Sequence, residues 1–220
     1  MINTRNEYNS RLNEVEIYFD ALSFLDKGTC EVKCIDILGA ESTMPVDDNL
    51  SRILKANGFL LLYNLIESTI RKSIGAIFAA IHSSSSSYKD LSSDLRKLWV
   101  KQECKNATIE KIMNIADSIL ADELISFKED CITISGNIDA QEIRKILKQF
   151  GGNEIRNGRN LKTIKDKRNN LAHGEFSFSE IGKDYTVQDL IKYKNDVKEY
   201  LDKVLDEIQQ YIEYKNYLKP

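Results

Sequence analysis

The sequence predicts an all-α fold, an up-and-down helical bundle with long second and last helices and room for one short strand or hairpin. Three observations support this prediction. Only two prolines occur in 220 residues, and proline interrupts helix interiors. Apolar residues recur every three or four positions over long stretches, which is the period of a helix with one buried face. Residues that favour helix starts precede several of these stretches.

The first helix is predicted to begin at Thr4, because Glu7 three residues later completes a capping-box pattern. It ends at Gly28, and its apolar face carries Tyr8, Leu12, Val15, Phe19 and Leu22. Residues 29–48 keep no period, so we interpret them as a loop with room for a short strand around 32–38. We therefore divide the chain into a helix-and-loop extension, 1–48, and a helical domain, 49–220. A single domain over 1–220 is the alternative.

Two long helices are predicted in the remaining chain. The second helix, about residues 50–81, follows a capping run at 47–49, and the last helix, about 187–217, opens with Thr186 and Asp189. The apolar stripe of the second helix alternates steps of three and four, with Glu67 as its only charged member. That stripe consists of Ile53, Ala56, Leu60, Tyr63, Glu67, Ile70, Ile74, Ile77 and Ile81.

Shorter helices are predicted over about 88–103, 108–124, 139–150 and 160–173. The serine run 83–87 between the long second helix and the next helix is interpreted as a flexible loop. Residues 131–136 resemble a short strand or turn. Gly151 and Gly174 are expected to end the helices that precede them, because glycine adopts the left-handed conformation common at helix ends.

Cationic side chains concentrate in one segment although the chain has a net charge of −3. Between Glu142 and His173, nine side chains are basic and three are acidic. A local basic patch can bind a polyanion such as RNA even on an acidic protein, and a solvated lysine-rich face is the alternative. The side chains predicted to contact RNA are Lys162, Lys165, Lys167, Arg159 and Arg156.

Several functional classes lack their sequence signals. The chain has no Gly-rich phosphate loop, no dinucleotide fingerprint, no zinc-protease helix and no nucleophile elbow. Its four cysteines lack the spacing of a zinc site, so no metal and no cofactor is predicted. The start of the chain does not resemble a signal peptide, and the most apolar run, 59–66, is too short to span a membrane. We therefore expect a cytoplasmic protein without a membrane partner.

Of the two histidines, His82 is expected at a solvated helix end, whereas His173 follows a polar ridge. Asn169, Asn170 and Asp166 lie four, three and seven positions before it, on the same helix face. The opposite face is apolar except for Arg168. An unpaired guanidinium in an apolar seam costs several kcal/mol, so Arg168 must be paired or must face a dimer interface or a substrate.

Two open questions follow for the partners of Arg168. Glu67 is a lone acid in the other apolar stripe and is therefore a candidate ion-pair partner, with Arg71 one turn further on as the local alternative. Arg168 and His173 leave a regular helix in directions about 140° apart. They can meet on one phosphate only if the helix unwinds near Gly174, or if two copies of the helix meet across a two-fold axis.

The residues from Arg168 to Gly174 resemble a known motif. Arg168-Asn169 followed by three residues and His173 is similar to the R-x4-6-H motif of the HEPN superfamily, whose members often carry a polar residue directly after the arginine. The run Arg-Asn-Asn-Leu-Ala-His-Gly, followed by Phe176 and a long last helix, resembles the prokaryotic branches of that superfamily. These include nucleases of toxin–antitoxin and anti-phage loci. The resemblance extends over about 140–217 and is looser over the second helix, and we claim none before residue 50.

The resemblance implies a homodimer with a composite active site and metal-independent cleavage of RNA. His173 would act as general base on a ribose 2′-OH or as acid on the leaving 5′-oxygen, because histidine exchanges protons near neutral pH. Arg168 would stabilise charge on the phosphate, and Asn169 would orient the histidine or a phosphate oxygen. The product would be a 2′,3′-cyclic phosphate, and DNA would survive.

The resemblance also implies restraint of the nuclease by an antitoxin or a neighbouring defence protein. Two alternatives stay open at this point. One is a non-catalytic HEPN module that binds RNA, a nucleotide or a partner protein. The other is a structural helical subunit.

Overall fold

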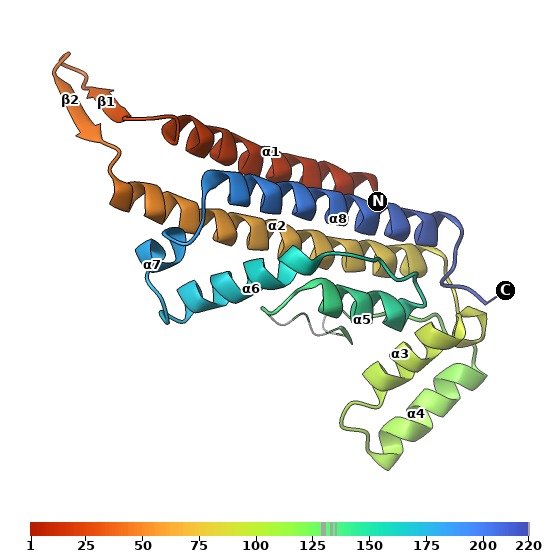
Figure 1. Cartoon of the computed structure of the whole chain (residues 1–220). Helices are drawn as coiled ribbons and strands as arrows, with labels where there is room; N and C mark the ends of the chain where they lie inside the picture. Colours follow the sequence, from red (N-terminus) through yellow and green to blue (C-terminus); the bar gives the residue numbers. More distant parts are fainter. Residues whose placement is uncertain (129–130, 133, 135, 220) are drawn as a thin grey trace. The chain divides into compact units, whose positions relative to one another are not determined.

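The computed structural model describes residues 1–128, 131–132, 134 and 136–219. It confirms the all-α bundle with one short antiparallel hairpin in the described part of the chain. Figure 1 shows the elements. In chain order they are α1 (Ile2–Leu25), β1 (Glu31–Ile35), β2 (Glu41–Pro45), α2 (Asp48–Ser83), the 3-10 turn η1 (Tyr88–Asp90), α3 (Ser93–Glu103), α4 (Ile109–Leu120), α5 (Ala140–Phe150), α6 (Arg159–Ala172), α7 (Phe178–Gly182) and α8 (Val187–Glu213).

The contacts of the chain group into two compact units. Unit 1 comprises Met1–Asn6, Glu67–Asn157 and Tyr200–Pro220, and unit 2 comprises Glu7–Ile66 and Gly158–Glu199. The helices α1, α2 and α8 each contribute residues to both units. The division at residue 48 that the sequence suggested stays a prediction.

Unit 2 is organised around the first half of α2. On one side Gly58 lets the ring of Phe19 from α1 approach closely, since a Cβ built on the glycine would lie 3.4 Å from that ring. Phe59 packs edge-on against Tyr185, with ring centroids 4.8 Å apart, and contacts Tyr193 of α8 at 5.8 Å. Burial of these apolar faces is the main favourable term that holds the helices together. The same core contains Leu62, Tyr63, Leu161 and Ile164, each 0% exposed.

The short helix α7 is fixed against the start of α2. A Cβ on Gly182 would lie 1.9 Å from the backbone oxygen of Arg52, so the two backbones touch at a point where no side chain fits. Ser179 also hydrogen-bonds the side chain of Asn49 at 2.5 Å. This contact fixes the chain just after the end of α6, where the candidate site lies.

The hairpin between α1 and α2 is exposed along its whole length. Its register pairs Val32 with Met44 and Cys34 with Ser42, and every residue of both strands is exposed. In Figure 1 it extends beyond the ends of α1 and α2. The sequence had room for a strand at 32–38, and the structure adds the pairing strand at 41–45.

Unit 1 is built from the second half of α2, the helices α3 and α5, and the second half of α8. Phe150 of α5 contacts Phe78 of α2, with ring centroids 5.7 Å apart, and its carbonyl accepts a hydrogen bond from the Tyr211 hydroxyl of α8 at 2.8 Å. The second part of the α2 stripe is buried as predicted, at Ile70, Ile74, Ile77 and Ile81. Helix α4 buries none of its residues and leaves Ile109, Ile112, Met113 and Leu120 exposed.

The serine run differs from the flexible loop that the sequence suggested. Ser86 and Ser87 are buried, and the carbonyl of Ser86 accepts a hydrogen bond from the N–H of Ile125 at 3.0 Å. Ser87 donates through both its N–H and its hydroxyl to Asp90, which forms a capping box for η1. Short polar side chains here satisfy the backbone of a turn. The predicted strand or turn at 131–136 includes residues 133 and 135, which lie outside the described residues.

None of the described helices combines the length and apolar character that crossing a membrane requires. Nor do the described residues place three His, Cys, Asp or Glu side chains together as a group that could hold a metal ion.

Candidate active site

Helix α6 carries the predicted catalytic pair and lies within unit 2. It starts after Gly158, which adopts a left-handed conformation with φ 81°, and it continues regularly to Ala172. At the other end, the N–H of Gly174 bonds the carbonyl of Leu171 and the N–H of Glu175 bonds that of Asn170. With Gly174 at φ 70°, this is the Schellman arrangement that ends many helices. The predicted stop at Gly174 is therefore confirmed.

His173 closes the helix and is exposed to solvent. Its φ and ψ of −91° and −4° are still near-helical, and its N–H bonds the carbonyl of Asn169 at 2.9 Å. The helix therefore unwinds after the histidine and not before it. Because the geometry up to His173 is close to that of a regular helix, the directions of Arg168 and His173 differ by about 140°.

Arg168 contacts the aromatic ring of Tyr63 in α2. The centre of its guanidinium lies 4.5 Å from the ring centroid, and the tyrosine is completely buried. A cation over an aromatic face is stabilised by the ring quadrupole, by about 0.5–2 kcal/mol depending on desolvation. This contact explains how an arginine can occupy the seam formed by Leu161 and Ile164.

Asn169 is the second partner of Arg168. The Nη1 group of Arg168 donates to the Oδ1 of Asn169 at 3.0 Å. The polar residue directly after the arginine thus orients the guanidinium. An arginine presents its donors as a planar fork that suits phosphate oxygens, so a fixed guanidinium is a suitable anion-binding group.

The polar ridge that leads to His173 is held by interactions within α6. Asp166 accepts a hydrogen bond from Lys162 at 2.7 Å and lies 3.8 Å from Lys165. The backbone oxygen of Asp166 and the carboxylate of Glu175 both face the side-chain amide of Asn170. When the nitrogen of that amide points toward them, it donates to both at 3.1 Å. Asp166 and Asn170 therefore support the end of the helix on which the histidine stands.

Of its two predicted partners, Arg168 and Arg71, Glu67 bonds Arg71, which lies on the same helix. Arg71 donates to the Glu67 carboxylate through Nε at 3.0 Å and Nη2 at 2.8 Å. Arg71 also donates to the backbone oxygen of Ile134 at 2.9 Å. Glu67 belongs to unit 1 and Arg168 to unit 2, and the pair between them stays a prediction.

The predicted RNA-binding cations are distributed unevenly. Lys162 and Lys165 lie next to Asp166, and the ammonium of Lys167 lies 5.5 Å from the ring centroid of Tyr185. Burial, with the nearby carboxylates of Asp184 and Asp189, raises the pKa of Tyr185, so this ring stays neutral under Lys167 at ordinary pH. Arg159 is exposed at the start of α6, while Arg156 belongs to unit 1.

Tyr63 is the site residue that sequence reasoning missed. It belongs to the apolar stripe of α2, one turn before Glu67, and was assigned to the core. Opposite charge is the usual expectation for the partner of a guanidinium in an apolar seam, although an aromatic ring in the facing stripe can also hold it. The signal was therefore present in the sequence as the aromatic member of the α2 stripe.

A half-buried, oriented guanidinium and an exposed imidazole, five positions apart at the end of one helix, define a helical-bundle protein with an R-x4-H site. The family model described as HEPN_MAE_28990-like HEPN matches residues 3–217. The chain therefore belongs to the HEPN family, as the motif suggested, and membership indicates a nuclease or RNA-related module. No curated protein and no solved structure matched the chain in the same comparisons.

Proposed function

We propose that the chain is a metal-independent endoribonuclease, with an active site composed of Arg168 and His173 from two copies of the chain. The observation that carries the proposal is the pair itself, an exposed histidine and a guanidinium fixed by Tyr63 and Asn169 on one helix. Membership of the HEPN family supports it. In a cell, such an enzyme would act as a toxin or an anti-phage effector, restrained by an antitoxin or a neighbouring defence protein.

In the proposed reaction the 2′-oxygen of a ribose attacks the adjacent phosphorus while His173 accepts its proton. Arg168 stabilises the negative charge that develops on the phosphate oxygens. The bond from phosphorus to the 5′-oxygen of the next nucleotide breaks, and that oxygen takes a proton from solvent water, while His173 returns its proton to the solvent. The products are a 2′,3′-cyclic phosphate and a 5′-hydroxyl. DNA lacks the attacking hydroxyl and stays intact.

The two-copy site follows from the directions of the side chains. Because α6 stays near-helical up to His173, one copy presents Arg168 and His173 about 140° apart. A two-fold axis that brings two α6 helices together would place the arginine of one copy beside the histidine of the other. The same separation favours the alternative, because the two groups of a single copy do not meet on one phosphate. That alternative is a HEPN module that binds RNA, a nucleotide or a partner protein without cutting RNA.

The test is cleavage of a mixed-sequence oligoribonucleotide in EDTA, with chemical analysis of the ends. We expect 2′,3′-cyclic phosphate ends, no cleavage of the matching DNA, and a loss of about 10²–10⁴-fold in His173→Ala. His82→Ala is the matched control, since His82 is exposed at the end of α2 and belongs to unit 1. Equal cleavage by wild type and His173→Ala, or 3′-hydroxyl ends, would contradict the proposal.

The composite site is tested by mixing two inactive variants. Co-expressed Arg168→Ala and His173→Ala chains with different tags are purified as a mixed dimer. That dimer has one site with an intact arginine from one chain and an intact histidine from the other, so cleavage should return. A site within one chain would leave the mixed dimer as inactive as either parent, and RNA binding without any cleavage in wild type would establish the alternative.

A further inference from the structure

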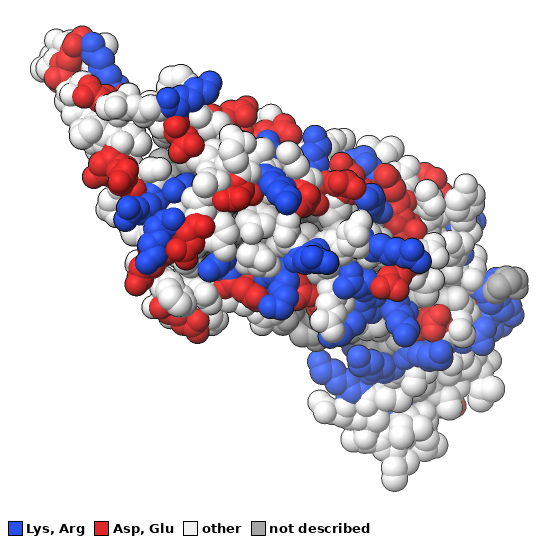
Figure 2. All heavy atoms as spheres, in the orientation of Figure 1, with Lys and Arg blue, Asp and Glu red and all other residues white. Residues whose placement is uncertain are grey.

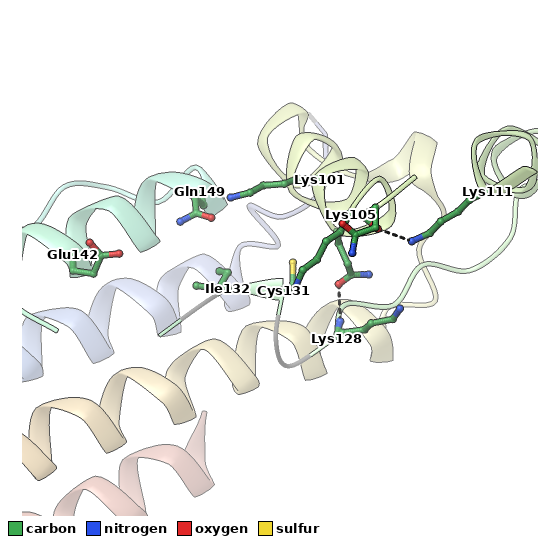
Figure 3. A pocket seen from close by; sticks show the side chains of 10 residues that line it. Lys101, Lys105, Lys111, Lys128, Cys131, Ile132, Glu142 and Gln149 are labelled. Carbon is green, nitrogen blue, oxygen red and sulfur yellow. Dashed lines mark hydrogen bonds between the residues drawn. The ribbon is translucent and has the colours of Figure 1, made fainter. Parts of the chain in front are cut away.

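Unit 1 contains a cavity of about 550 Å³ whose wall is rich in lysine. It lies between the last turn of α3, the turn before α4, the segment after α4 and one face of α5. Figure 3 shows it from close by. Its volume is typical of small-ligand sites. The lining residues are Lys101, Gln102, Lys105, Asn106, Lys111, Lys128, Cys131, Ile132, Glu142 and Gln149.

The charge of this wall is strongly one-sided. Among the described lining residues, four lysines face one carboxylate, Glu142, and that carboxylate already bonds Lys145 at 3.2 Å. Neither Lys101 nor Lys128 forms an ion pair with a described residue, and the ammonium of Lys111 donates to the backbone oxygen of Lys105 at 3.1 Å. Ammonium groups gathered in a concave site create a positive potential that attracts anions. Figure 2 shows Lys and Arg gathered around α3 and α5 with few acidic side chains among them.

Hydrogen bonds fix the backbone positions from which two of these lysines extend. Gln102 accepts a hydrogen bond from the N–H of Lys128 at 2.8 Å and donates to the carbonyl of Ser126 at 3.3 Å. This amide ties the segment after α4 to the end of α3, and so fixes the positions of Lys101 and Lys128 relative to each other. Asn106, with φ 57°, turns the chain from α3 into α4. The cavity is therefore formed before any ligand enters.

The lining indicates which part of a ligand is recognised. Amide groups of Gln102, Asn106 and Gln149 accompany the lysines, and Figure 3 shows Lys101 reaching toward Gln149. The described lining residues include no aromatic ring on which a base could stack. Lysine ammonium groups bind phosphate as point charges and tolerate many arrangements of its oxygens. The described lining groups therefore suit phosphate groups and offer no surface for a base.

We propose that this cavity binds a ligand with several linked phosphate groups, held by Lys101, Lys105, Lys111 and Lys128. Two sources share this chemistry, a free polyphosphate and the backbone of an RNA strand. The site lies within unit 1 and uses neither Arg168 nor His173, so it stands or falls separately from the proposed cleavage.

The test measures binding of two probes by calorimetry, inorganic tripolyphosphate and a short oligoribonucleotide, without divalent metal. RNA binding is measured in chains that all carry His173→Ala, so that the strand is not cut. The variant Lys101→Ala/Lys128→Ala should bind weaker by about tenfold or more, because two ammonium groups that would bond phosphate oxygens are removed. The control Lys97→Ala/Lys148→Ala removes the same charge from exposed positions of α3 and α5 outside the cavity.

The outcomes separate the sources and can overturn the proposal. Loss of tripolyphosphate binding alone identifies a free polyphosphate, and loss of binding of both probes identifies the RNA backbone as a ligand. Lys101→Arg/Lys128→Arg should keep the binding and shows that the chain still folds when both lysines are replaced. If neither probe binds the wild type, or if the control variant weakens binding as much as the cavity variant, the proposal is wrong.

Discussion

Units 1 and 2 both gather cationic side chains, but they hold them by different means. In unit 2, Arg168 lies over Tyr63, Lys167 lies over Tyr185, and Lys162 bonds Asp166. In unit 1, four lysines converge on a cavity where the carboxylate among the described lining residues, Glu142, bonds another lysine. An aromatic ring or a carboxylate fixes one cation at one position, whereas a hydrogen-bonded loop collects several.

The two ways of holding cations suit different tasks. A guanidinium held over a buried ring has little freedom, and such preorganised donors are effective where charge develops in a transition state. A cluster of flexible ammonium groups adapts to many phosphate geometries and favours binding over chemistry. This difference supports placing the proposed chemistry at α6 and the proposed binding of phosphate groups in the cavity of unit 1.

The largest loss of cleavage rate among these predictions is expected on replacing Arg168, the cation that unit 2 holds over Tyr63. Arg168→Ala should lower the rate of RNA cleavage by about 10²–10³-fold, because one donor to the developing charge is lost. Arg168→Lys should recover only part of the rate, since an ammonium cannot replace the planar fork. Lys192→Ala, an exposed position of α8 in the same unit, is the control. Cleavage is followed on one oligoribonucleotide, and equal rates in Arg168→Ala and the control would remove Arg168 from the site.

The next prediction concerns the close contact between α7 and α2, which fixes the chain next to the candidate site. Gly182→Ala should lower the free energy of unfolding by about 1–3 kcal/mol or more, because its Cβ would lie 1.9 Å from the backbone oxygen of Arg52. Gly75→Ala, in α2 within unit 1, meets nothing within 4 Å and should raise that free energy by about 0.5–1 kcal/mol. Urea unfolding measures both. A Gly182→Ala chain as stable as wild type would show that α7 does not touch α2 in this way.

The sequence predicted the long helices because their caps and apolar periods agree. The predicted stripe of α2 is buried at Ala56, Tyr63, Ile70, Ile74, Ile77 and Ile81, while Ile53 and Leu60 are only half-buried. The glycine stop at Gly174 is present in the structure. The sequence allowed for one short strand or hairpin but placed only a strand at 32–38. Every residue of the hairpin is exposed, so burial leaves no period from which to place the pairing strand at 41–45. The serine run was assigned to a flexible loop from its composition, and composition does not reveal hydrogen bonds such as those from Ser87 to Asp90.

The two cationic sites were predictable to different degrees. Arg168, Asn169 and His173 lie within six positions, so one motif identified them together. The lysines of the cavity are spread over residues 101–128 and come from a helix end, a turn, a helix start and a loop. Their convergence depends on the amide of Gln102 and the left-handed Asn106. No local pattern in the sequence encodes such a meeting of distant residues.

The smallest change in cleavage rate is expected at Tyr63, which we regard as a positioning residue for Arg168. Tyr63→Phe keeps the ring under the guanidinium and should retain the rate of cleavage at saturating RNA. Tyr63→Leu removes the ring, and the loss of a cation–π contact of about 0.5–2 kcal/mol should lower that rate by about 2–30-fold. Both variants alter a fully buried residue, so thermal unfolding is measured beside the kinetics. A purely structural role would make the rate follow stability in both variants. Rescue by phenylalanine at unequal stability would instead show that the aromatic face is what holds Arg168 in place for the phosphate.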